Sequence, residues 1–293
     1  MATPTLSGSA TSAAPPPPDL PVTPPSAWYR ASRWLRRRLL AFYSVLALAY
    51  MFLPVAYVIA FSFNKPAGRQ NITWNQFSFD AWLNICRDPT ICNSVGVSLR
   101  LAFITMIIST ILGALISFAL VRHKFRGRES TNLLIFLPMA TPEVVLGASL
   151  LALFLNLNFN LGFGTILIAH IMFCISFVVV TVKARLAGLD PRLEQAAMDL
   201  YANEWQTFRR ITLPLVFPGI AAAAALAFAL SFDDFIITNF NSGQTVTFPM
   251  YVWGAAQRGI PPQVNVIGSL MFGVALLLVI LGQVVSRRRS RGR

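Results

Sequence analysis

Charge is scarce in this chain of 293 residues, because charged residues make up 12% of it and hydrophobic residues 55%. Soluble domains carry about 25% charged residues. A soluble globular fold is therefore excluded, and most of the chain is expected to lie in lipid. The charge present is mostly of one sign, with 24 Lys and Arg against 11 Asp and Glu.

Cysteine is also rare, and three cysteines are too few for a disulfide scaffold. Cys86 and Cys92 share a loop that is predicted to lie outside the membrane, and they could pair in an oxidising compartment. Cys174 falls in a membrane segment, where packing is its expected role.

Motifs of catalysis are missing as well. The sequence has no nucleotide-binding P-loop, and no Ser/His/Asp or metal-ligand cluster stands out. We therefore expect that the chain is not an enzyme, does not hydrolyse ATP and holds no cofactor or metal of its own. The net charge of +13 could indicate nucleic acid, but the basic residues flank apolar segments. Such residues orient a membrane protein and contact anionic lipid headgroups.

Long apolar stretches are what the chain does have, and each can cross a hydrocarbon core, which takes about 20 helical residues. They predict an all-α polytopic membrane protein with six transmembrane helices. Proline at positions 54, 138, 142 and 218 is expected to kink these helices without breaking them. The predicted spans are residues 39–61, 94–121, 133–155, 161–182, 215–237 and 264–285.

The distribution of Lys and Arg predicts the orientation. Nineteen of them fall in the terminal regions and in alternate loops, whereas the other loops hold only four. By the positive-inside rule both termini are cytoplasmic. Residues 1–27, rich in Pro, Ser and Thr, are expected to form a disordered tail. Residues 28–92 hold a basic flank, the first span and an outer loop, and residues 286–293 form a basic cytoplasmic tail.

Residues 190–214 form a charged cytoplasmic loop between two apolar spans. Asp190 and Pro191 are typical of a helix start. Ala196 and Ala197 are small enough for another backbone to approach closely, and Glu194 and Asp199 place a charge at either end. This pattern favours a short helix that fits into a cleft of another protein.

A second short helix is predicted after the first. Asn203 and Gln206 form a variant capping box, so the helix should run toward Leu213, and Pro214 marks the entry to the fifth span. Periodicity alone equally allows an amphipathic helix that lies on the lipid headgroups.

The spacing of Glu194, Ala196, Ala197, Ile211, Leu213 and Pro214 resembles the coupling loop of ABC importer permeases. The resemblance covers residues 93–285 and implies the type I ABC importer permease fold. It further implies a second permease as heterodimer partner, two ATPase subunits that bind ATP and Mg, an extracytoplasmic binding protein, and the bacterial inner membrane. Tyr201 stands where that family has glycine. Because Tyr adopts a positive φ with difficulty, we expect the bend to shift to Asn203.

Carboxylates at membrane depth are costly and indicate function. Glu143 is about 16 Å along the third span, and Asp233 and Asp234 are about 27 Å along the fifth, at 1.5 Å per residue. They could replace the hydration of a cation, with Trp253 adding a ring face. The alternatives are that Asp233 or Asp234 caps a helix or pairs with Arg258, and that Glu143 bonds to carbonyls freed by Pro142.

Residues 231–243, 247–251 and 258–265 resemble the second permease of spermidine/putrescine importers, which implies a polyamine substrate. Related permeases for ferric iron, thiamine or phosphonate share parts of the pattern. A self-contained secondary transporter, with Glu143 and Asp233 carrying ions, is the alternative of another class, but no inverted repeat is evident. His170 in the fourth span could relay protons or, more commonly, bond across helices.

Overall fold

The computed structural model describes residues 27–68 and 70–291, with side chains for residues 38–68 and 70–284. It divides into two compact units, residues 1–55 and 56–293. The predicted disordered tail, except for residue 27, lies outside the described residues. The first unit is seen as most of helix α1 (Ala27–Phe61), which continues through Pro54 and has exposed apolar side chains. The second unit contains every other element.

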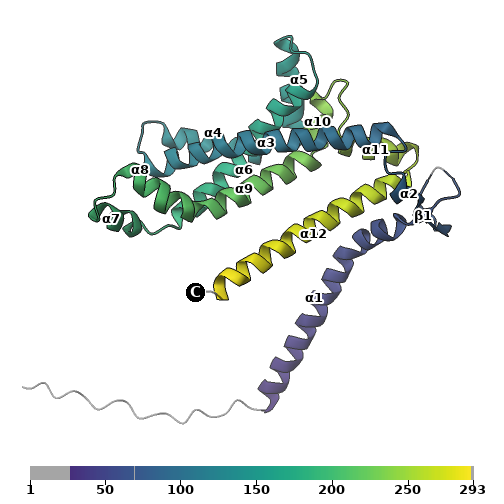
Figure 1. Cartoon of the computed structure of the whole chain (residues 1–293), viewed down its shortest axis with the longest axis horizontal. Helices are drawn as coiled ribbons and strands as arrows, with labels where there is room; N and C mark the ends of the chain where they lie inside the picture. Colours follow the sequence, from purple (N-terminus) through teal and green to yellow (C-terminus); the bar gives the residue numbers. More distant parts are fainter. Residues whose placement is uncertain (1–26, 69, 292–293) are drawn as a thin grey trace, which may run out of the picture. The chain divides into compact units, whose positions relative to one another are not determined.

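Three long helices form the centre of the second unit and lie side by side (Figure 1): α3 (Pro89–Arg122), α6 (Phe163–Ala187) and α9 (Leu213–Asp233). Small side chains bring them close, as membrane helix packing requires. A Cβ on Gly113 of α3 would lie 2.5 Å from a methyl of Val178 on α6. The Ser117 hydroxyl of α3 also donates across to the Val179 carbonyl at 3.1 Å.

The prediction that the third span is a single kinked helix is wrong. The chain forms α4 (Arg128–Ala140) and α5 (Glu143–Asn156), whose axes differ by 107°. Thr141 is extended, at φ −81° and ψ 132°, because a residue before proline avoids the helical region. Pro142 therefore breaks the helix, whereas α4 passes through Pro138 and α9 through Pro218. In Figure 1, α5 rises steeply beside α10.

The described residues contain five helices that are long and apolar enough to cross a membrane, or six if α4 and α5 form one broken span. The predicted count of six is reached only if α4 and α5 are counted together as one span. The sixth predicted span belongs to α12 (Pro262–Arg291), which extends through most of the predicted basic tail.

One end of the second unit carries the short elements β1 (Asn64–Lys65), β2 (Gln76–Phe77), α2 (Asp80–Leu83) and α11 (Phe248–Arg258). The strands pair antiparallel, with Asn64 opposite Phe77. A small apolar core of Ile91, Phe248, Val264 and Ile267 joins α3, α11 and α12. Cys86, in the turn after α2, forms a disulfide with Cys92 of α3, a pairing that the sequence left open.

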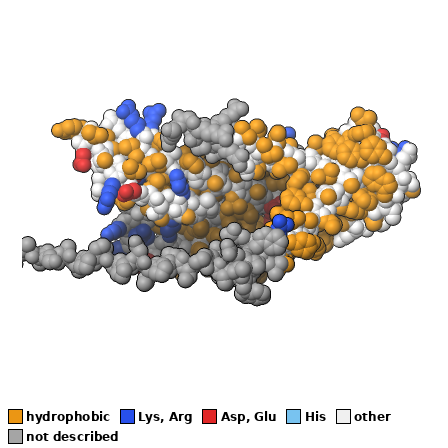
Figure 2. Space-filling view, turned by 90° about the horizontal axis from the view of Figure 1, so that it is seen from below, with side chains coloured by type: hydrophobic (Ala, Val, Ile, Leu, Met, Phe, Trp, Pro, Cys, Tyr) orange, Lys and Arg blue, Asp and Glu red, His pale blue; other side chains and the backbone are white. Residues whose placement is uncertain are grey.

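The other end carries α7 (Arg192–Asp199), α8 (Glu204–Thr207) and a π-helical turn, η1 (Phe208–Thr212), which leads directly into α9. Most Lys and Arg side chains that are visible in Figure 2 lie toward this end. The two ends of the bundle therefore differ in charge as the sequence predicted.

Candidate functional site

The fifth predicted span breaks in the region that holds its two carboxylates. Helix α9 ends at Asp233, Asp234 is extended, and α10 (Ile236–Asn241) follows. The Asp234 carboxylate accepts from the backbone N–H and the hydroxyl of Thr238, each at 2.8 Å. It thereby satisfies a backbone donor that has no partner in the first turn of α10. The prediction of one helix through residue 237 is wrong because this side chain competes with the helix backbone.

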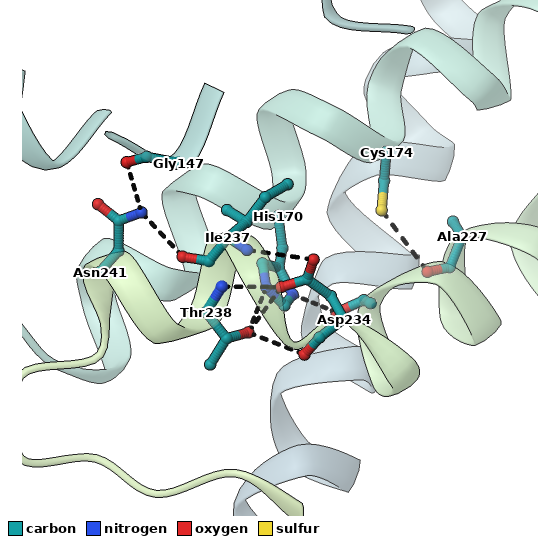
Figure 3. A network of polar contacts seen from close by, with 9 residues as sticks. Gly147, His170, Cys174, Ala227, Asp234, Ile237, Thr238 and Asn241 are labelled. Carbon is teal, nitrogen blue, oxygen red and sulfur yellow. Dashed lines mark hydrogen bonds and ion pairs between the residues drawn. The ribbon is translucent and has the colours of Figure 1, made fainter. Parts of the chain in front are cut away.

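His170 of α6 holds this break in place from the neighbouring helix (Figure 3). Its ring is fully buried, with Nδ1 2.8 Å from Ser231 Oγ. Its Nε2 lies 2.9 Å from Thr238 Oγ1 and 3.2 Å from Asp234 Oδ2. Of the two roles considered for His170, hydrogen bonding across helices is the one that the structure shows. We call His170, Ser231, Asp234 and Thr238 the junction network.

The two adjacent carboxylates have different surroundings. The Asp234 side chain is 5% exposed, whereas Asp233 is exposed and lines a cavity of about 390 Å³. Trp253 lines the same cavity, and its ring centroid is 5.2 Å from that of Phe235. Asp233 and Trp253 are thus brought together as predicted, while Asp234 belongs to the junction network. The cavity is lined by Phe232, Asp233, Phe235, Phe248, Pro249, Val252, Trp253 and Ala256.

Glu143 also lies near this break. It is the first residue of α5, is exposed, and is close enough to Asp233 and Asp234 for both to repel its charge. Among the described residues its carboxylate has no hydrogen bond or ion pair, so its predicted alternative role at the carbonyls beside Pro142 is not found. Arg258, the other alternative partner, donates to the Gly254 carbonyl at 3.2 Å.

Helix α5 is attached to α10 through Asn241, whose amide donates to the Gly147 carbonyl at 3.3 Å and to the Ile237 carbonyl at 2.9 Å (Figure 3). Gly147 permits this approach, because a Cβ there would lie 2.9 Å from the Phe240 ring. The helix that begins with Glu143 is therefore fixed against the junction.

At the opposite end of the bundle, both predicted helix starts in residues 190–214 are found. Asp190 accepts from the Arg192 N–H at 2.9 Å, and the helix begins one residue later than expected. Asn203 and Gln206 form the reciprocal capping box, with bonds of 2.8 and 3.1 Å. The second helix continues through η1 directly into α9, and Pro214 is the second residue of α9.

The expected shift of the bend to Asn203 is wrong. Tyr201 itself adopts a φ of 61°, and Asn203 is extended at −75°. The Tyr201 side chain is 98% exposed, so no packing conflict opposes this backbone conformation, although a non-glycine residue there is strained. Tyr201 therefore takes the turn conformation that glycine would take.

The residues of the predicted docking helix divide into inward and outward sets. Ala197 is 7% exposed, and its carbonyl accepts from the Ala202 N–H at 3.1 Å. Ala196 and Asp199 are exposed. Leu213 is partly buried as the first residue of α9, and Pro214 follows it at the surface. The exposed apolar side chains of α7, its turn and α8, here called the apolar ridge, are Leu193, Met198, Leu200, Tyr201 and Trp205.

Glu194 has partners within the chain that the sequence did not reveal. Its carboxylate accepts from Arg122 of α3 and, at 2.6 Å, from the Thr212 hydroxyl. Arg122 and Thr212 are 72 and 18 residues away in the sequence, so local spacing gave no signal for either. Ser231 and Thr238 of the junction network were missed because the helix break that aligns them was not foreseen.

Known proteins provide an independent comparison. Residues 109–291 match the family described as "Binding-protein-dependent transport system inner membrane component". The chain is 34% identical over 243 residues to the spermidine/putrescine transport system permease protein PotC of Haemophilus influenzae, covering 83% of this chain and 94% of that protein. It is 32% identical over 257 residues to the putrescine transport system permease protein PotI of Escherichia coli, covering 85% and 91%.

Solved structures share the fold. The chain is similar to a chain of a bacterial ABC transporter involved in alginate import, at a TM-score of 0.65 and 16% identity over 88% of this chain and 99% of that one. It is also similar to a chain of the MetNI methionine ABC transporter, at a TM-score of 0.53 and 14% identity over 70% and 98%. The broken helices, the loop of short helices and these matches together show that the chain belongs to the family of binding-protein-dependent transport system inner membrane components, as a permease subunit of an ABC importer with the type I fold.

Proposed function

We propose that this chain carries polyamines across a bacterial inner membrane as one of two different permease subunits. The names of two relatives that match over more than four fifths of this chain refer to spermidine or putrescine transport. In the proposed assembly, two ATPase subunits bind ATP and Mg on the cytoplasmic side, and an extracytoplasmic binding protein delivers the substrate.

The observation that carries the proposal is the cavity beside Asp233. A carboxylate and the ring faces of Phe235 and Trp253 border the same space. Organic cations are attracted both to carboxylates and to aromatic faces. A polyamine alternates ammonium groups with methylene chains, so it fits a path that alternates carboxylates with rings. Glu143 supplies a further carboxylate near Asp233.

The apolar ridge supports a docking site for the ATPase. Leu200 and Tyr201 are 81% and 98% exposed at the tip of a short helix, and exposed clusters of large apolar side chains mark interaction sites. The ridge lies at the basic end of the bundle (Figure 2), which the positive-inside rule assigns to the cytoplasm together with both termini.

The proposed mechanism is a two-state exchange. ATP closes the ATPase subunits, which draw the two docking loops of the permease pair together and rock the spans, so that the path opens outward. When the hydrolysis products are released, the path closes on the outer side and opens again toward the cytoplasm. Substrate and ATP are then coupled because each favours one state over the other.

The test uses the complex purified with its co-expressed neighbours, and it measures ATP hydrolysis stimulated by binding protein and spermidine. The variant Asp233→Asn should raise the spermidine concentration needed for half-stimulation by about tenfold or more, since a hydrogen bond to a charged group contributes about 1.5–3 kcal/mol. Glu129→Gln, which removes an exposed carboxylate of α4, is the matched control and should behave as the wild type. Stimulation by ferric iron or thiamine but not by polyamines would overturn the proposal.

A further inference from the structure

Three side chains from three separate elements meet where α7 adjoins the bundle. Arg122, the last residue of α3, donates to Glu194 Oε1 of α7 and, at 3.2 Å, to Thr212 Oγ1 of η1. The Thr212 hydroxyl donates to the same Glu194 oxygen at 2.6 Å. Each member therefore contacts the other two, and we call the three residues the staple.

The staple is partly shielded from water. Thr212 is 1% exposed, and the side chains of Arg122 and Glu194 are 33% and 27% exposed. A charge-assisted hydrogen bond with shared partners is stronger than an isolated surface pair. The Arg122 guanidinium also lies 6.0 Å from the ring centroid of Phe118, a contact that holds it further in place.

A second contact joins the same elements. The Phe118 ring of α3 meets the Phe208 ring of η1 edge to face at 5.3 Å, and Phe208 stacks on Trp205 of α8 at 5.7 Å. Helix α3 thus contacts both α7, through Arg122, and the α8–η1 segment, through Phe118. An eight-residue helix such as α7 is not stable alone, so these contacts determine where it lies.

We propose that Glu194 is a positioning residue that acts inside the permease: it fixes α7 to the adjoining ends of α3 and α9, so that a displacement of α7 moves both long helices together. The ATPase then contacts the apolar ridge rather than the Glu194 carboxylate. This inference rests on the proposed coupling to an ATPase.

The geometry carries the proposal because each partner of Glu194 lies at the end of a different long helix or directly beside it. Arg122 ends α3, and Thr212 directly precedes α9. These two helices pack against each other and against α6 through the core. Without the Glu194 carboxylate, α7 keeps its covalent links but loses its direct bond to α3.

The test is a charge exchange in the full complex, with wild-type binding protein and spermidine. Glu194→Arg and Arg122→Glu should each reduce stimulated ATP hydrolysis by about tenfold, within the usual range of coupling between sites, while the ATPase still co-purifies. The double variant Glu194→Arg with Arg122→Glu should recover at least about half of the stimulation, because the ion pair is restored in reverse. The matched control pairs Arg122→Glu with Asp199→Arg, an exposed position at the far end of α7, and should show no recovery.

Two results together would overturn the proposal: the double variant does not recover ATP hydrolysis, and the ATPase no longer co-purifies with the single variant Glu194→Arg. Both results are expected if the Glu194 side chain contacts the ATPase directly. If the reversed variants do not assemble, Glu194→Ala, Arg122→Ala and the double variant replace them, with thermal unfolding as the readout. The proposal requires that the double variant be no less stable than the worse single one, and additive losses would contradict it. Failure of the proposed function would appear differently, as a wild-type complex that spermidine does not stimulate.

Discussion

The imidazole of His170 on α6 lies 3.2 Å from the carboxylate of Asp234 at the break between α9 and α10. The preceding residue, Asp233, is exposed beside the aromatic cavity. Two adjacent carboxylates of one sequence motif therefore have different roles. Asp234 holds the break with His170 and Thr238, which leaves Asp233 as the carboxylate available to a substrate.

Replacement of His170 should destabilise the protein more than it alters substrate preference. His170→Leu leaves Ser231 and the Asp234 carboxylate buried with one partner fewer, and a buried polar group that loses its hydrogen-bond partner costs about 1–3 kcal/mol. The low end applies here because Thr238 still donates to Asp234. Thermal unfolding in detergent checks this, with His123→Leu as control because His123 is the other histidine and is exposed. Equal melting temperatures of the two variants would contradict the account.

Asp234→Asn and Asp233→Asn should separate stability from transport. An Asn at 234 keeps an acceptor for the Thr238 N–H but loses the charge beside His170, so about 1.5–3 kcal/mol of stability should be lost. An Asn at 233 should leave thermal unfolding unchanged and weaken spermidine stimulation. The two variants are compared by melting temperature and by half-stimulating spermidine concentration. A stable Asp234→Asn with the same substrate defect as Asp233→Asn would show that both carboxylates contact substrate.

Tyr201 offers a direct test of the apolar ridge. Asn tolerates positive φ, so Tyr201→Asn should preserve the turn and remove the exposed ring. We expect stability within about 1 kcal/mol of the wild type and a lower yield of co-purified ATPase. Tyr201→Val is the contrasting variant, because a β-branched residue at this φ strains the turn itself. Full ATPase recovery with Tyr201→Asn would exclude the ring from the docking surface.

The contact between Asp88 and Tyr251 predicts a pH dependence at the opposite end of the bundle. Tyr251 donates its hydroxyl to the Asp88 carboxylate at 3.0 Å. Burial, and then this bond, raise the pKa of Tyr251 to about 12. Hydrogen bonds from Thr90 lower the pKa of Asp88. The stability that the raised Tyr251 pKa contributes is present below the unfolded value near 10 and is lost as pH rises toward 12.

The lowered Asp88 pKa contributes stability above about pH 3.8, the usual value, and this part is lost as pH falls below that value. The difference in phenolate absorbance between wild type and Tyr251→Phe isolates the Tyr251 titration. Its midpoint should lie near pH 12, and a midpoint near 10 would refute the contact.

Hydropathy predicted the long helices well because burial in lipid requires continuous apolar length. It predicted the apolar spans within α1, α3, α6 and α12 to about five residues at each end; these spans are Arg38–Phe61, Pro89–Arg122, Phe163–Ala187 and Pro262–Val284. Two failures have one cause, the competition of a local group with the helix backbone. Pro142 removes a donor and restricts Thr141, and Asp234 offers a side-chain acceptor to Thr238.

The candidate site was predicted in its composition but not in its arrangement. Asp233 and Trp253 line one cavity, although α10 lies between α9 and α11 in the sequence. The partners of Asp234 and Glu194 could not be predicted, since His170 and Arg122 come from distant segments whose register depends on helix packing. Tyr201 departed from expectation because an exposed side chain tolerates a backbone conformation that a buried one would resist.

The most direct test of the account is spermidine uptake into vesicles that contain either the full complex with its binding protein or this chain alone. The account predicts ATP-dependent accumulation by the full complex, reduced by Asp233→Asn, and no uptake by the chain alone. Nucleotide-independent uptake by the chain alone would contradict it.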